Sequence, residues 1–227
     1  MLFRSQEAYS ALLDYPADYL RRYDQLCQKG RMTGVAANDA HQNIGVVVKL
    51  LAGGKVRIED VLDQKLAELD ARQLPLLAPL VLGRKPGDRI FEIRLDPYPV
   101  AFRHVSTHLL MKEQTEPAVW DALENGRAYV SCDWLCDPTG FVCWVEDASG
   151  RHEMGGRVPP AKGARLSASA PLPCRWKVIR NGKEVHATEG RSVEWTIDQP
   201  GVHRVEAWLN IAGDDKFWIL TNPFYVQ

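Results

Sequence analysis

The 227-residue sequence contains no apolar run that approaches the roughly eighteen residues of a membrane-spanning helix. Its N-terminus also lacks a basic region followed by an apolar stretch. We therefore expect no membrane partner and a cytoplasmic protein; a signal peptide upstream of residue 1 would instead make it secreted or periplasmic.

The sequence also has no excess of one charge, because its 28 Lys and Arg residues nearly balance its 29 Asp and Glu residues. Without a basic field, we expect no nucleic-acid partner.

Cysteine is scarce and irregularly spaced. The five cysteines include no Cys-x-x-Cys pair, the spacing typical of structural zinc sites. Cys132, Cys136 and Cys143 suggest part of a zinc site, but no fourth ligand lies at a usual spacing. We interpret the cysteines as buried free thiols in strands.

One stretch does bring an acid and an imidazole close together in the sequence. Residues 34–43 read GVAANDAHQN, in which small and β-branched residues precede Asp39 and His41. On an extended backbone, residues i and i+2 project to the same side. The two side chains would converge past the end of a strand, as ligands of a divalent cation do, with Gln42 and Asn43 as neighbouring amides. An ordinary polar turn is the alternative interpretation.

This stretch resembles the last metal motif of the PHP (polymerase and histidinol phosphatase) superfamily, whose strands end in His and Asp ligands around a multinuclear metal centre. The resemblance continues in residues 103–108 (RHVSTH), 133–141 (DWLCDPTGF) and 218–223 (WILTNP). It implies that Asp39 and His41 are metal ligands and that zinc, manganese or iron is the cofactor. It also implies that the chain is the C-terminal part of a metal-dependent phosphoesterase-like hydrolase with an appended β domain.

Most of the PHP metal ligands are missing from this chain. A PHP barrel opens with a His-x-His strand, and no two of the six histidines have that spacing. We therefore expect an incomplete metal site, with no catalytic residue assigned, and little or no enzymatic activity of the chain alone. Apolar surface left by a missing barrel predicts self-association or pairing with an N-terminal PHP portion.

The first part of the chain mixes helix and strand patterns. Residues 5–29 predict a helix interrupted near Pro16, followed by a strand running to Asp39, an order typical of a wound barrel or sheet. Residues 44–58 predict a hairpin with a glycine-containing loop. Residues 60–86 combine helical leucine spacing with an arm broken by prolines, and we assign them no structure.

Two histidines follow in a predicted strand, residues 102–111. At about 3.3 Å per residue, His104 and His108 would lie about 13 Å apart on one face and could not share one ion. We interpret them as hydrogen-bonded structural residues, with a second metal site as the alternative. A helix is predicted over residues 115–125 and a strand over 127–134.

From residue 141 the sequence predicts short strands with turns between them, including an Asn-Gly hairpin signal at 181–182. This pattern is typical of an immunoglobulin-like antiparallel β-sandwich. We predict that the tryptophans at 144, 176, 195, 208 and 218 pack in its core. Carbohydrate binding by these rings is the alternative.

The predicted fold class is therefore α+β. Residues 1–137 would form a partial α/β segment, a PHP-barrel remnant with a hairpin and arm insertion, and residues 138–227 an immunoglobulin-like β-sandwich. The predicted function is the C-terminal portion of a PHP-type metal-dependent phosphoesterase. The alternative is a non-catalytic binding or assembly module whose sandwich binds carbohydrate or a protein partner.

Overall fold

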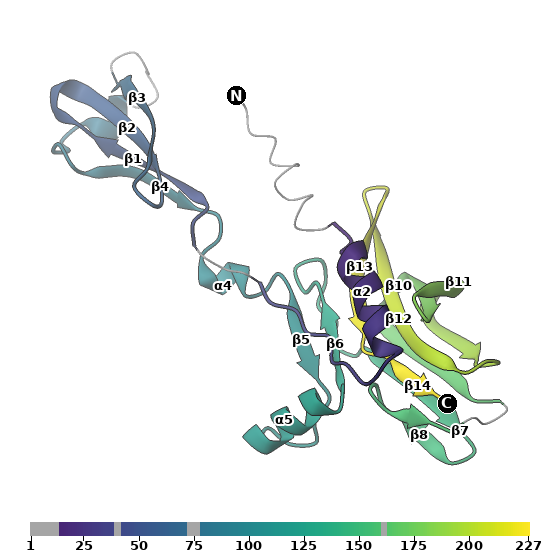
Figure 1. Cartoon of the computed structure of the whole chain (residues 1–227). Coiled ribbons are helices and arrows are strands. Elements are labelled where there is room, and N and C mark those ends of the chain that lie inside the picture. The colour runs from purple at the N-terminus through teal and green to yellow at the C-terminus, as the bar shows by residue number, and fades with distance from the viewer. Residues whose placement is uncertain (1–13, 39–41, 72–77, 160–162) are drawn as a thin grey trace. The chain divides into compact units, whose positions relative to one another are not determined.

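The computed structural model describes residues 14–38, 42–71, 78–159 and 163–227 (Figure 1). The chain divides into two compact units. We call Met1–Ala37 together with His104–Gln227 the main unit, and Asn38–Arg103 the inserted unit. Asp39 and His41, the predicted metal ligands, lie outside the described residues, as does part of the segment 60–86.

The inserted unit contains a four-stranded antiparallel sheet in the order β3-β2-β1-β4. Its strands are β1 (Gly45–Leu50), β2 (Lys55–Asp60), β3 (Lys65–Asp70) and β4 (Arg89–Arg94), and its helical turns are η1 (Ala52–Gly54), α3 (Ala78–Val81) and α4 (Tyr98–Ala101). The predicted hairpin over residues 44–58 is confirmed, because β1 pairs with β2 around Gly53 in a left-handed conformation. Val48, Leu50, Val56 and Ile90 form the core of this unit.

The main unit contains a ten-stranded sheet whose central path runs β5-β6-β13-β12-β10-β7-β8. Its strands are β5 (Ser106–Leu109), β6 (Ala128–Ser131), β7 (Val142–Asp147), β8 (Gly150–His152), β9 (Arg157–Val158), β10 (Arg165–Arg180), β11 (Lys183–Thr196), β12 (Gly201–Ile211), β13 (Asp214–Thr221) and β14 (Phe224–Val226). Its helices are α2 (Ala17–Cys27) and α5 (Glu116–Glu124). All described strand pairs are antiparallel except β14 with β9.

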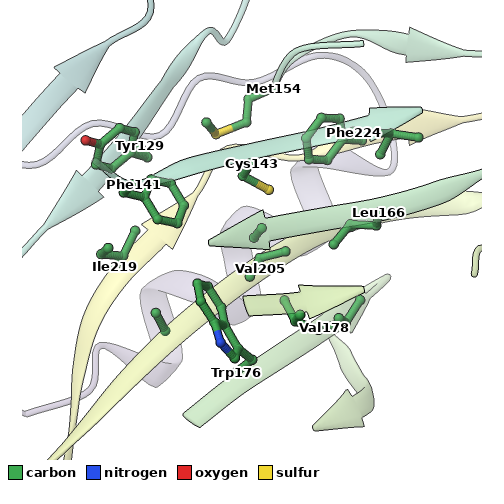
Figure 2. Close-up of a cluster of buried hydrophobic side chains, with 14 of the residues drawn as sticks. Tyr129, Phe141, Cys143, Met154, Leu166, Trp176, Val178, Val205, Ile219 and Phe224 are labelled. Atoms are coloured by element: carbon green, nitrogen blue, oxygen red, sulfur yellow. The ribbon is translucent and has the colours of Figure 1, made fainter. Parts of the chain in front are cut away.

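The long strand β10 organises this sheet because it changes partners along its length. Residues 165–169 pair with β7, whereas residues 175–180 pair with β12. Between them lies an irregularity where Pro171 and Pro173 cannot donate ladder hydrogen bonds. The sheet curls around a core that includes Trp176, Leu166 and Phe224 (Figure 2).

Helix α2 lies against β12 through a buried ion pair. The Arg204 guanidinium donates to both Asp24 carboxylate oxygens, at 2.7 and 2.9 Å, and to Glu206 Oε1 at 2.5 Å. Tyr15, just before the helix, donates to the same Glu206 oxygen at 2.5 Å. Charges this deeply buried are stable only when they are paired in this way.

The predicted α+β fold class is wrong. The structure is mostly antiparallel β, with 47% strand and 15% helix, and the described residues contain no remnant of an α/β barrel. The next described strand after helix α2 is β1, which pairs antiparallel on both sides, and the buried partner of α2 is a strand 180 residues later in the chain. The ten-stranded sheet draws strands from both sides of residues 137 and 138, where the sequence predicted a domain boundary.

Several local predictions are confirmed. Helix α5 begins after Thr115, whose hydroxyl accepts a hydrogen bond from the Ala118 amide as an N-cap does. Trp176, Trp208 and Trp218 are buried, whereas Trp144 is only half-buried and does not belong to the core. All five cysteines are free thiols and all but Cys136 are buried, but only Cys143 and Cys174 lie in strands, because Cys27 is in α2 and the other two follow β6.

Candidate functional site

The segment that leads towards Asp39 is described up to Asn38, and it forms neither helix nor strand. Hydrogen bonds to other parts of the main unit hold it instead. The Met32 amide donates to the Tyr225 hydroxyl at 3.0 Å, and the Thr33 hydroxyl donates to the Leu123 carbonyl at 2.5 Å. We call residues 32–36 the tethered segment.

Asn222 holds the centre of the tethered segment. Its Oδ1 accepts hydrogen bonds from the Gly34 amide at 2.7 Å and the Tyr23 hydroxyl at 2.5 Å. Its Nδ2 donates to the carbonyls of Gly34, at 3.1 Å, and Ala128, at 2.9 Å. A Cβ at position 34 would lie 3.3 Å from Asn222 Oδ1 and from Tyr23, so this close approach favours glycine.

Thr107 of β5 holds the end of the tethered segment. The Ala36 amide donates to Thr107 Oγ1 at 3.0 Å, and the same hydroxyl donates to the Ala36 carbonyl at 3.2 Å. Thr107 and Asn222 belong to two of the four segments that carry the family resemblance, residues 103–108 and 218–223. They hydrogen-bond the backbone five and three residues before Asp39, at Gly34 and Ala36 respectively.

A second polar cluster joins β5, β6 and the loop after β6. His108 Nε2 lies 2.8 Å from Ser131 Oγ and 3.2 Å from Asp133 Oδ1, and Ser131 Oγ also donates to Asp133 Oδ1. The imidazole stacks on Tyr129 with ring centroids 4.6 Å apart. Burial, together with the negative charge of Asp133, raises the pKa of Tyr129 to about 12.

This cluster has the residue types of a serine nucleophile triad but not its geometry. In such a triad the acid contacts one imidazole nitrogen and the serine the other, so that the base is oriented for proton transfer. Here Ser131 and Asp133 both approach Nε2. The cluster also lies on the opposite face of β5 from Thr107, since neighbouring strand residues alternate. It therefore fits the structural histidine predicted for position 108 and is separate from the tethered segment.

His104 lies outside β5, and its ring centroid is 5.4 Å from that of Trp134. The predicted strand over residues 102–111 is shortened to Ser106–Leu109, so the two histidines do not share a strand face. Among the described residues, no three His, Cys, Asp or Glu side chains converge as a metal site requires.

A groove of about 1260 Å³ opens on the main unit. It lies among α5, the chain after β5 and the β7–β8 hairpin, and residues of both charge signs line it, including Arg127, Asp121 and Arg151. The Arg151 guanidinium lies 4.6 Å from the centroid of the Trp144 ring. The Trp144 indole N–H is buried without a hydrogen-bond partner in the described structure. Trp144 was predicted to lie in the core, and the groove was not predicted, because it combines residues far apart in the chain.

Comparison with protein-family models gives no match, and neither a curated protein nor a solved structure matches the chain significantly. No helix within the described ranges is long and apolar enough to cross a membrane.

Proposed function

We propose that the stretch containing Asp39 and His41 is a partial divalent-metal site of the kind found in PHP-type phosphoesterases, presented here by a β-rich scaffold. The observation that carries this proposal is the tethering of the backbone just before it. Asn222 and Thr107 make several hydrogen bonds to Gly34 and Ala36, which lie in the same ten-residue motif as the two ligands. Fixing a backbone close to a site is how proteins pre-organise metal ligands.

The two donors suit the metals that the resemblance implies. An aspartate oxygen and a histidine nitrogen are ligands of zinc, manganese and iron. Two protein ligands, however, leave a divalent ion mostly hydrated. Its bound water would then stay far from the pKa of about 7 reached at complete zinc sites, so hydroxide would be scarce at neutral pH. We infer that this chain alone binds metal weakly and does not hydrolyse phosphoesters.

The experiment is calorimetric titration of the full chain with Mn²⁺ and Zn²⁺, with phosphomonoester and phosphodiester assays on the same sample. We expect weak metal binding that Asp39→Ala abolishes and that Asp18→Ala, a change of an exposed carboxylate on α2, leaves unchanged. Thr107→Val keeps a β-branched side chain but loses both bonds to Ala36, so metal binding should weaken several-fold. No metal binding by the wild-type chain would refute the site. Tight binding with turnover that Asp39→Ala abolishes would show that the site is complete.

The groove favours a second candidate, a non-catalytic module that binds carbohydrate. An aromatic ring next to charged side chains suits a sugar, which stacks on the ring and hydrogen-bonds at its rim. The specific observation behind this candidate is that Trp144 lines the groove beside Arg151. A neutral oligosaccharide mixture in the same calorimeter provides the comparison. Heat that is lost in Trp144→Ala but kept in Trp120→Ala, which changes an exposed tryptophan of α5, would favour this function.

A further inference from the structure

The outer edge of β4 has no strand partner among the described residues, because β4 is the last strand in the order β3-β2-β1-β4 (Figure 1). The Leu95 amide donates to the Ile44 carbonyl, at 2.9 Å, on the β1 side. Backbone directions alternate along a strand, so Ile93 and Phe91 also face β1. The amides and carbonyls of Glu92 and Arg94 therefore point away from the sheet. Such an edge is a template for another strand.

The side chains of this edge are exposed and alternate in character. Residues 91–95 read FEIRL, and Phe91, Ile93 and Leu95 are 48%, 43% and 48% exposed. Ile93 is paired with Val46 and Phe91 with Val48, so both share the face that carries the core of the inserted unit. Natural sheet edges usually avoid such an apolar row, which a partner strand would bury.

This five-residue sequence is complementary to itself when a second copy runs antiparallel. With Ile93 opposite Ile93, Phe91 faces Leu95 and Glu92 faces Arg94, and each of these pairs occurs twice. Glu92 and Arg94 are the residues with outward-pointing backbone groups, so they form the hydrogen-bonded pairs. Apolar cross-strand pairs and opposite charges both stabilise a sheet.

The backbone and the charges together select this register. If the register shifted by one residue, the outward-pointing amides and carbonyls of one copy would lie opposite residues of the other copy whose amides and carbonyls already bond to β1. A shift by two residues in either direction would place Glu92 opposite Glu92 or Arg94 opposite Arg94, which is repulsive.

We propose that a second copy of this chain pairs with β4 in this register. The two four-stranded sheets then form one eight-stranded antiparallel sheet, with a two-fold axis at Ile93. The interface is isologous, so the same patch of each copy serves both sides, and it closes at the dimer. The proposal is independent of the metal site, because the pairing of β4 uses neither Asp39 nor His41.

Charge reversal tests the register. Sedimentation velocity of the full chain over a range of concentrations should show a monomer–dimer equilibrium. Glu92→Arg and Arg94→Glu each convert two attractive cross-strand pairs into like-charge pairs, which should raise the dimer Kd about tenfold or more. The double variant Glu92→Arg/Arg94→Glu restores opposite charges across the interface and should recover the dimer. Glu146→Arg, at an exposed site of the main unit, is the matched control.

A cysteine at the two-fold axis tests the same geometry without relying on charge. Residues facing each other in a non-hydrogen-bonded antiparallel pair have Cα atoms about 4.5 Å apart, within the range for a disulfide. Ile93→Cys should therefore give a covalent dimer under mild oxidation, whereas Leu62→Cys, exposed in the β2–β3 turn, should not. Circular dichroism confirms that each variant is folded. A chain that stays monomeric at all concentrations, or a dimer equally strong in the single and double charge variants, would overturn the proposal.

Discussion

His203 of β12 is fully buried, and its imidazole has one described hydrogen-bonding contact, from Nδ1 to the Gly201 carbonyl at 3.1 Å. Nε2 has no partner among the described residues. Burial lowers the pKa of His203 to about 4, because a charged imidazole would lose its hydration there. The folded protein therefore keeps this side chain neutral.

The lowered pKa of His203 predicts that the protein loses stability in mild acid. In the unfolded chain this histidine has its ordinary pKa of about 6.5, so below that pH the unfolded state binds a proton that the folded state does not. The contribution of His203 to the free energy of unfolding is therefore complete above pH 6.5 and falls as the pH drops towards 4. We expect the free energy of unfolding to decrease by about 2 kcal/mol between pH 7.5 and pH 5 from this residue. Urea unfolding at both pH values measures it. His203→Phe should remove most of this difference, whereas His186→Gln, at a half-buried site, should keep it. An unchanged pH dependence in His203→Phe would contradict the assignment.

At the scale of elements, a buried ion pair joins α2 to β12. Asp24 and Arg204 are 5% and 3% exposed, and Asp24 accepts two hydrogen bonds from the guanidinium. Asp24→Asn leaves the buried cation with less compensation, so we expect a loss of about 3 kcal/mol in the free energy of unfolding. Asp18→Asn breaks an exposed pair with Arg21 on the same helix and should cost less than about 1 kcal/mol. Equal effects of the two changes would show that the buried pair does not hold the helix.

The elements also show what the sequence could predict. Helix α5 and the β1–β2 hairpin were predictable, because a cap, a glycine turn and an apolar pattern all lie within a few neighbouring residues. The tethered segment looked like a strand of a wound barrel, since small and β-branched residues favour that state. Its hydrogen-bond partners, Asn222 and Thr107, lie 188 and 71 residues away. No local pattern reports such distant partners, so neither the contacts of this segment nor the groove could be predicted from the sequence.

At the scale of the whole molecule, one carboxylate joins the two chain segments that lead into and out of the sheet of the inserted unit. Asp96 accepts hydrogen bonds from the Asn43 amide at 2.8 Å and the Ile44 amide at 2.9 Å. The chain therefore enters and leaves this unit at neighbouring points. Together with a separate core, such adjacent ends are what allow a unit to be inserted into another.

This arrangement predicts that the two units fold independently. Replacing residues 43–96 by a short Gly-Ser linker should leave the main unit with a cooperative unfolding transition, because its core contains no residue from that range. Thermal unfolding followed by circular dichroism compares the shortened and full chains, and Asp96→Asn in the full chain serves as a milder variant that weakens only the hydrogen bonds of this carboxylate. The shortened chain also lacks β4, so it should be monomeric at concentrations where the full chain pairs. Loss of cooperative unfolding in the shortened chain would mean that the main unit needs the inserted unit for its stability, and the division into two folding units would then be wrong.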